Sequence, residues 1–194
     1  MALKTTIRPR GPYSLALSAR RASDTTRRFR NGVLTCVLAD GEQVSAHQLP
    51  DGRLVLRTNT EAGLAQLRFV LGADDDHTPF LERFRDDELL AGPIRHLKGL
   101  RPIRTATVTH ALLRAIVGQL ITSREARSIE WRLIRATTEP VGGLQSPPLP
   151  HHFGRLAPAE LYRFRLPARK ATALVRICRT FDPERLRRSH IEIL

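Results

Sequence analysis

Residues 109–136 read THALLRAIVGQLITSREARSIEWRLIRA, and this stretch decides how the second half of the chain folds. Apolar residues recur in it at three- and four-residue spacing, which predicts two amphipathic helices in succession. The inward residues of the first helix are Leu112, Leu113, Ile116, Val117 and Leu120, and those of the second are Ala126, Ile129, Leu133 and Ile134.

The break between these helices falls near residues 121–123. Thr122 is followed three residues later by Glu125, the spacing of a capping box, in which hydroxyl and carboxylate satisfy free backbone N–H groups at a helix start. A new helix is therefore predicted to begin there. The turn before it, Gln119-Leu120-Ile121, carries an apolar pair in basic surroundings.

The chain has 194 residues and a formal net charge of +13. Residues 91–194 hold 19 Lys and Arg against 7 Asp and Glu, whereas residues 1–90 hold 13 against 12. A GC-rich genome explains the preference for arginine over lysine, but it does not explain this asymmetry. A one-sided excess favours a polyanion partner, above all nucleic acid, over a solvated basic face without a partner.

The first half of the chain mixes strands with one helix. Alternation over residues 13–18 predicts a strand, and residues 33–38, 44–47 and 53–57 predict an antiparallel meander with turns at Asp40-Gly41 and Pro50-Asp51-Gly52. A helix that covers this sheet is predicted to follow Thr60, which caps its start, and to end at Gly72. The expected fold class is α+β, with domains at 1–92 and 93–194 and further helices at 158–163, from Pro167 and after Asp182.

Several kinds of chemistry find no support in the sequence. It contains no GxSxG, CxxC or HExxH motif, so no metal, cofactor or catalytic residue is assigned. Asp74-Asp75-Asp76 and His151-His152 are expected to be surface loops. Cys36 and Cys178 are expected to be free buried thiols, typical of a reducing cytoplasm. With no long apolar run and no signal peptide, no membrane association is expected.

The turn at 119–121 admits two interpretations. Leu120 and Ile121 are either the last core residues of a helix, or a wedge that fills the space left by a base turned out of a DNA duplex. In the second interpretation Gln119 offers hydrogen bonds to the orphaned partner base. The backbone amides at Ser123 and Arg124, with the charge of Arg124, would meet a phosphate.

Here the sequence resembles a known family. The segment AIVGQLITS at residues 115–123, preceded by Gly99-Leu-Arg-Pro102, is similar to the corresponding part of the DNA-3-methyladenine glycosylase II family, in the helix-hairpin-helix DNA glycosylase superfamily. Weaker similarity at Gly11-Pro-Tyr13 and over residues 153–179 follows in the same order. The resemblance implies the first helices of an all-α glycosylase domain behind the α+β domain.

The resemblance also implies a function. That family removes alkylated purines from double-stranded DNA in base excision repair, by flipping the base and using an aspartate without a metal. Leu120 matches its intercalating wedge and Gln119 the adjacent glutamine. A bacterial cytoplasmic protein associated with the nucleoid is implied.

The chain departs from the family beyond residue 180. The family's Leu-Pro-Gly-x-Gly hairpin and its catalytic aspartate have no counterpart here, because the last glycine is Gly154 and Asp182 has the pattern of a helix cap. We therefore expect an N-terminal portion that is inactive alone. Apolar faces at 112–120 and 171–178 should then lack partners and promote self-association. The alternative is a non-enzymatic helix-turn-helix DNA-binding protein with residues 123–136 as its recognition helix.

Overall fold

The computed structural model describes residues 3–186, which form two compact units with the division between Arg104 and Thr105. The division falls later than the domain boundary expected at 92/93. Side chains explain the difference: Arg101 donates to the carbonyl oxygens of Gly72 and Pro12, and Arg104 to the carboxylate of Asp75, so this segment is tied to the first unit.

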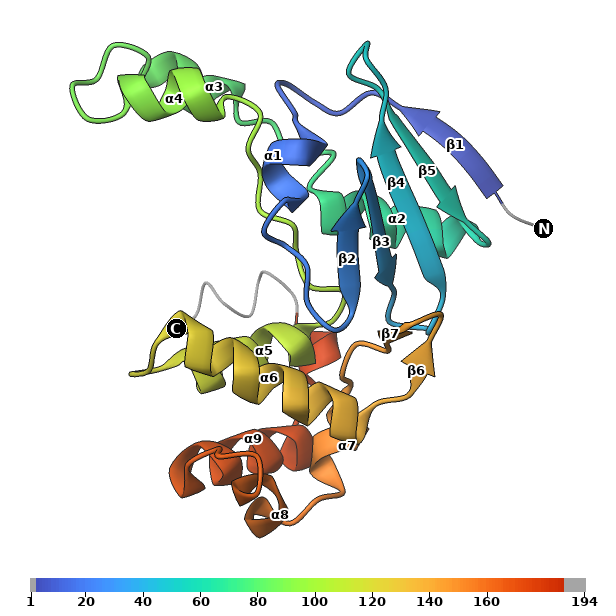
Figure 1. The fold of residues 1–194 in the computed structure, drawn as a ribbon, viewed down its shortest axis with the longest axis vertical. Helices are drawn as coiled ribbons and strands as arrows, with labels where there is room; N and C mark the ends of the chain where they lie inside the picture. Colours follow the sequence, from blue (N-terminus) through green and yellow to red (C-terminus); the bar gives the residue numbers. More distant parts are fainter. Residues whose placement is uncertain (1–2, 187–194) are drawn as a thin grey trace. The chain divides into compact units, whose positions relative to one another are not determined.

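The first unit is built on a five-stranded antiparallel sheet in the order β1-β5-β4-β3-β2 (Figure 1). Its strands are β1 (Leu3–Ile7), β2 (Arg27–Arg30), β3 (Val33–Val37), β4 (Gln43–Gln48) and β5 (Leu54–Thr58). The predicted meander is β3-β4-β5, and the α+β class is confirmed. The edge strands β1 and β2 were not predicted, because basic and polar residues interrupt their alternation.

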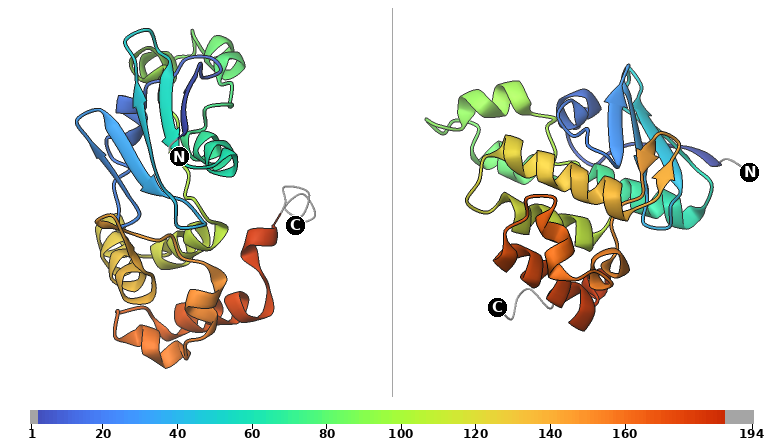
Figure 2. Two further views of the ribbon diagram at one scale, coloured as in Figure 1. Left: turned by 90° about the vertical axis from the view of Figure 1, so that its right-hand side faces the viewer. Right: turned by 60° about the horizontal axis from the view of Figure 1, so that its bottom comes forward.

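Helix α2 (Glu61–Leu71) covers one face of the sheet (Figure 2). The Thr60 hydroxyl accepts a hydrogen bond from the N–H of Gly63 at 2.9 Å, and Gly72 ends the helix in the left-handed conformation, both as predicted. Leu67, Val70 and Leu71 are buried. Two short helices, α3 (Thr78–Arg83) and α4 (Ala91–Leu97), follow.

The strand predicted over residues 13–18 is wrong: this segment forms helix α1 (Leu15–Ala19). Ser14 caps it by accepting from the N–H of Leu17 at 3.3 Å, and the N–H of Ser14 donates to the carbonyl of Gly99 at 2.8 Å. A Cβ at Gly99 would lie 2.7 Å from the Ser14 nitrogen, so only glycine fits there. Alternation over so few residues does not separate a strand from one helical turn.

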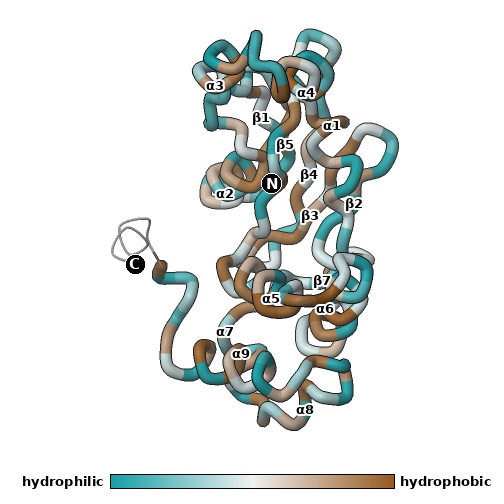
Figure 3. Tube along the Cα trace, turned by 90° about the vertical axis from the view of Figure 1, so that its left-hand side faces the viewer, coloured by the Kyte–Doolittle hydropathy of each residue, from teal (hydrophilic) through white to brown (hydrophobic). Residues whose placement is uncertain are grey.

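The second unit consists mainly of helices around one apolar core. Hydrophobic residues gather on α5, as the brown colour of this helix shows (Figure 3). The elements are α5 (Val108–Gly118), α6 (Ser123–Thr137), β6 (Pro140–Val141), β7 (Leu144–Gln145), α7 (Pro150–Gly154), α8 (Pro158–Tyr162), α9 (Ala168–Thr180) and the 3-10 helix η1 (Pro183–Arg185).

The expectation of unpartnered apolar faces is wrong for the described residues. Leu113, Ile116 and Val117 of α5 are buried in the same cluster as Leu174 and Val175 of α9. The two faces cover each other, with α6 and α7 completing the core. Apart from Leu120, which is exposed at the end of the first face, these two faces therefore have partners within the described residues.

Two further expectations concern polar residues. His152 was expected in a surface loop, but it lies on α7, is 3% exposed and accepts a hydrogen bond at Nδ1 from the N–H of Leu149 at 2.8 Å. That expectation is wrong, because Pro150 starts a helical turn that carries His152 inward. Asp182 caps η1 as predicted, accepting from the N–H of Glu184 at 3.1 Å.

Both cysteines are buried free thiols, as expected, and burial raises the pKa of Cys36 to about 12 and that of Cys178 to about 11. Neither thiol is therefore a nucleophile near neutral pH. None of the helices over residues 3–186 has the length and apolarity needed to cross a bilayer.

Candidate nucleic-acid interface

The sharp turn between α5 and α6 is the site that the sequence singled out. Helix α5 ends at Gly118, and α6 begins at Ser123 with Thr122 as its cap. The Thr122 hydroxyl accepts a hydrogen bond from the N–H of Glu125 at 3.2 Å. The predicted start of the second helix is therefore confirmed.

Leu120 stands at the tip of this turn. Sequence periodicity placed it on the apolar face of the first helix, but the helix ends two residues earlier and the Leu120 side chain is 102% exposed. Its backbone has φ 57°, in the left-handed region that leucine rarely adopts. Such a conformation costs roughly 1–2 kcal/mol, so the surrounding structure must hold it.

A side chain from another helix supplies part of that restraint. Lys170 of α9 donates from Nζ to the carbonyl oxygens of Val117 at 3.0 Å and Gln119 at 2.6 Å. These carbonyls belong to the carboxyl end of α5, where backbone acceptors lack helical partners and a cation is favourable. Ile121, on the other side of the tip, is half-buried and packs against the helical core. Leu120 is thus exposed on a turn that is anchored at both sides.

The remaining predicted site residues surround the tip. Gln119, Ser123 and Arg124 are all exposed, and Ser123 and Arg124 lie in the first turn of α6. The first backbone N–H groups of a helix carry a partial positive charge, which favours an anion there. The turn therefore combines one apolar projection with hydrogen-bonding and positively charged groups beside it.

The helices that carry the turn are joined by polar contacts that the sequence did not indicate. Glu130 of α6 is buried, and its Oε1 lies 2.8 Å from both His110 Nε2 and Arg114 Nε of α5. Such a network fixes the two helices at one register, because separating them would leave buried polar groups unpaired.

A second carboxylate caps α5 at its other end. Glu184 of η1 accepts from the N–H groups of Val108 at 2.9 Å and Thr109 at 2.8 Å, and from the Thr109 hydroxyl at 2.7 Å. This bond set satisfies free amides at the helix start and complements the helix dipole. No local sequence signal pairs residues this far apart, so neither Glu184 nor Lys170 was identified from the sequence.

The fold matches that of solved DNA glycosylases. The chain superposes on a 3-methyladenine DNA-glycosylase from Archaeoglobus fulgidus with a TM-score of 0.79 and 19% identity, over 93% of this chain and 68% of that one. The 8-oxoguanine glycosylase/lyase of Clostridium acetobutylicum, solved with double-stranded DNA, gives a TM-score of 0.73 and 14% identity over 100% and 69% of the two chains.

A sequence relative points the same way. Over 195 residues the chain is 25% identical to a DNA-3-methyladenine glycosylase of Bacillus subtilis, covering 92% of this chain and 64% of the relative. The chain thus spans less than two thirds of that relative's length. No protein-family model matches the sequence.

The fold expected from the resemblance is confirmed: the described residues have the fold of solved DNA glycosylases. The sequence is in addition similar to that of a DNA-3-methyladenine glycosylase.

Proposed function

We propose that this chain carries the DNA-opening part of a base excision repair glycosylase that acts on alkylated purines. The observation that carries the proposal is Leu120, a fully exposed leucine on an anchored turn with left-handed backbone. Burying a leucine side chain is worth about 1.5–3 kcal/mol, and this fold leaves it in water at a strained position. The burial energy is recovered if the side chain enters a DNA base stack, and the strained backbone is what holds the side chain in the projecting position.

The neighbouring residues take roles that suit their chemistry. Gln119 offers amide donors and an acceptor to the orphaned base or the backbone. Ser123 and Arg124 meet a phosphate through helix-start amides and the guanidinium group. Ile121 belongs to the apolar pair, and its contact with the core holds the turn that carries Leu120.

Substrate class and location form the finer part of the proposal. The Bacillus subtilis relative is named for 3-methyladenine, which supports alkylated purines in double-stranded DNA as the substrate. The proposed reaction needs no metal or cofactor, and the proposed location is the bacterial nucleoid. The proposal concerns binding and opening of DNA, and it assigns no residue to the release of the base.

Duplex opening by the chain tests the proposal directly. A duplex carrying 2-aminopurine beside a flexible lesion brightens when the fluorescent base leaves the stack. We expect brightening with the unaltered chain and a loss of about tenfold or more in the opened fraction with Leu120→Ala, since the burial of that side chain is lost.

Leu89→Ala is the matched control, because Leu89 is also exposed, at 83%, but belongs to the first unit and not to the turn between α5 and α6. It should leave the signal unchanged. Equal loss with both variants, or unchanged opening with Leu120→Ala, would contradict the wedge.

A further inference from the structure

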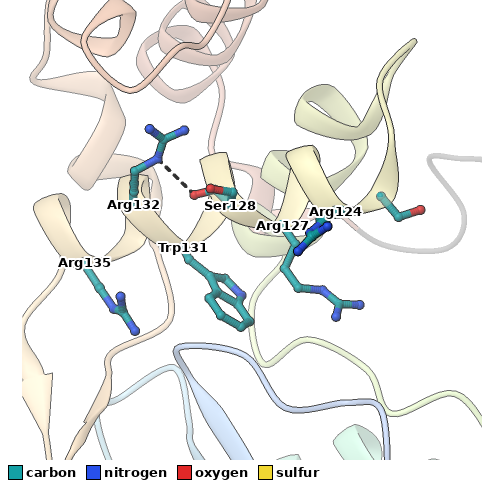
Figure 4. A pocket seen from close by; sticks show the side chains of 7 residues that line it. Arg124, Arg127, Ser128, Trp131, Arg132 and Arg135 are labelled. Carbon is teal, nitrogen blue, oxygen red and sulfur yellow. Dashed lines mark hydrogen bonds between the residues drawn. The ribbon is translucent and has the colours of Figure 1, made fainter.

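A groove of about 480 Å³ runs along α6, on the side away from its apolar stripe, and the proposed function does not use most of it (Figure 4). Ser123 and Arg124 at its start belong to the proposed DNA contact. The other residues that matter here lie further along the same helix: Arg127, Ser128, Trp131, Arg132 and Arg135.

Helical spacing brings an aromatic residue and several cations together in this groove. Arg127, Trp131 and Arg135 follow one another at four-residue steps, and Figure 4 shows them projecting in the same direction from α6. Arg132 points the other way, and its Nε donates to the carbonyl of Ser128 at 3.2 Å. The indole ring is therefore flanked by a guanidinium group on each side along the helix.

These cations are not neutralised within the part of the chain that the structure describes. No ion pair joins Arg124, Arg127 or Arg135 to a carboxylate of residues 3–186. Arginines three residues apart, such as Arg124 and Arg127, repel each other on a helix surface. The fold thus keeps a cluster of like charges that an external anion would stabilise.

The indole group provides a second indication. Its Nε1 makes no hydrogen bond with any of the described residues, although indole N–H groups ordinarily find a partner when they are covered. The indole N–H is thus a covered donor without a partner in the described part of the chain, and its ring lies between cations. A nucleotide has the complementary parts: an aromatic base, polar base edges and a phosphate on each side.

We infer that this groove binds an unpaired nucleotide of a DNA strand, with the base stacked on Trp131 and the flanking phosphates at Arg127 and Arg135. The inference rests on the proposed function, because Arg124 leads from the wedge turn into the groove. The groove would thus accept a nucleotide displaced from the duplex by stacking its base on Trp131. Trp131 would in this way increase the affinity for DNA that has an unpaired base.

Trp131 is the only tryptophan of the chain, so tryptophan fluorescence, excited selectively over that of the two tyrosines, reports on this groove alone. The 194-residue chain is titrated with a duplex carrying one bulged nucleotide, with the same duplex fully paired, and with inorganic polyphosphate. We expect quenching with the bulged duplex, weaker quenching with the paired duplex and none with polyphosphate. Equal quenching by polyphosphate would show a simple anion site and overturn the stacking.

Labelled-DNA anisotropy provides the matching binding constants. Trp131→Ala should weaken binding of the bulged duplex roughly 5- to 150-fold, the range for one stacked base, and Trp131→Phe should retain most of the affinity. Arg127→Ala should lower the slope of log affinity against log salt by about one. Arg176→Ala, an exposed arginine on α9, is the charge-matched control and should leave the bulge preference unchanged.

The outcomes separate this inference from the proposed function. A chain that binds neither duplex contradicts the proposed function. If binding and opening of DNA depend on Leu120 but not on Trp131 or Arg127, the proposed function stands. The inference that the groove binds a nucleotide is then overturned.

Discussion

Lys170 on α9 donates a hydrogen bond of 2.6 Å to the carbonyl oxygen of Gln119, 51 residues earlier in the sequence. The same ammonium group reaches Val117 at 3.0 Å. The turn that exposes Leu120 is therefore held by a helix that is distant in sequence.

This relationship predicts that Lys170→Gln weakens DNA opening without removing any group that touches DNA in the proposal. Loss of the charge-assisted hydrogen bonds of Lys170 should destabilise the second unit by up to about 3 kcal/mol. It should also lower the 2-aminopurine signal several-fold. Arg169→Gln removes the same charge one residue earlier, where the side chain is exposed. If the two variants behave alike, the anchor has no role beyond charge.

Leu120→Gly should separate stability from function. Glycine adopts the left-handed backbone without strain, which recovers roughly 1–2 kcal/mol, and its greater freedom in the unfolded chain costs roughly 0.5–1 kcal/mol. We expect the free energy of unfolding to stay equal or rise by up to about 1.5 kcal/mol, while DNA opening is lost.

Denaturant titration followed by Trp131 emission measures the stability of this unit. Asn31→Gly is the control, because Asn31 also has positive φ, 51°, but lies in the first unit. A clear destabilisation by Leu120→Gly would show that the leucine side chain, not its backbone, is needed for folding.

Arg101 is predicted to be essential to the first unit. Its side chain is 1% exposed, and it donates to the carbonyl oxygens of Arg10, Pro12 and Gly72. Arg101→Ala should cost about 3 kcal/mol or more, since each buried acceptor left unpaired costs about 1–3 kcal/mol.

Hydrogen exchange of the β3–β5 amides measures this loss in the first unit. Arg101→Lys should rescue it poorly, because one ammonium group cannot span the positions that the guanidinium fork reaches. Arg95→Ala on the exposed side of α4 should have an effect within about 0.5 kcal/mol.

Acid should destabilise the second unit through His152. Burial, together with the nearby His151, lowers the pKa of His152 below 6.5, against the opposing effect of Glu139. As pH falls below 6.5, the unfolded imidazole takes up a proton while the folded one stays neutral. Stability is therefore full above that pH and declines below it, until the lowered folded pKa is reached.

His152→Gln should flatten this part of the stability curve, which urea titrations from pH 7 down to about pH 5 would reveal. His96→Gln, at an exposed position on α4, should leave the curve unchanged. An identical pH dependence in His152→Gln and the unaltered chain would assign the acid sensitivity to another group.

Footprinting and a base-release assay distinguish the glycosylase interpretation from a helix-turn-helix regulator. We expect weak, salt-sensitive protection at flexible or damaged sites, whatever their sequence. In the proposal Leu120 enters places where the duplex deforms easily, and the arginines bind phosphates, which every sequence carries. Release of methylated purine in the base-release assay supports the glycosylase interpretation, whereas protection of one fixed sequence supports the regulator.

Local patterns in the sequence were sufficient for many elements of the fold. The meander β3-β4-β5, the caps at Thr60, Thr122 and Asp182, and the left-handed Gly72 all follow from interactions within a few residues. The edge strands and α1 were missed because short segments take their structure from partners elsewhere, as Ser14 does from Gly99.

The sequence by itself determined the α+β class, the basic second half and the position of the break between two helices, because periodicity and capping act over one or two helical turns. Only the tertiary structure decided that Leu120 leaves the core, that α5 and α9 bury each other's apolar faces and that α6 carries a groove around Trp131. These features depend on contacts such as Lys170 with Gln119, and residues so far apart in the chain meet only once the helices have packed.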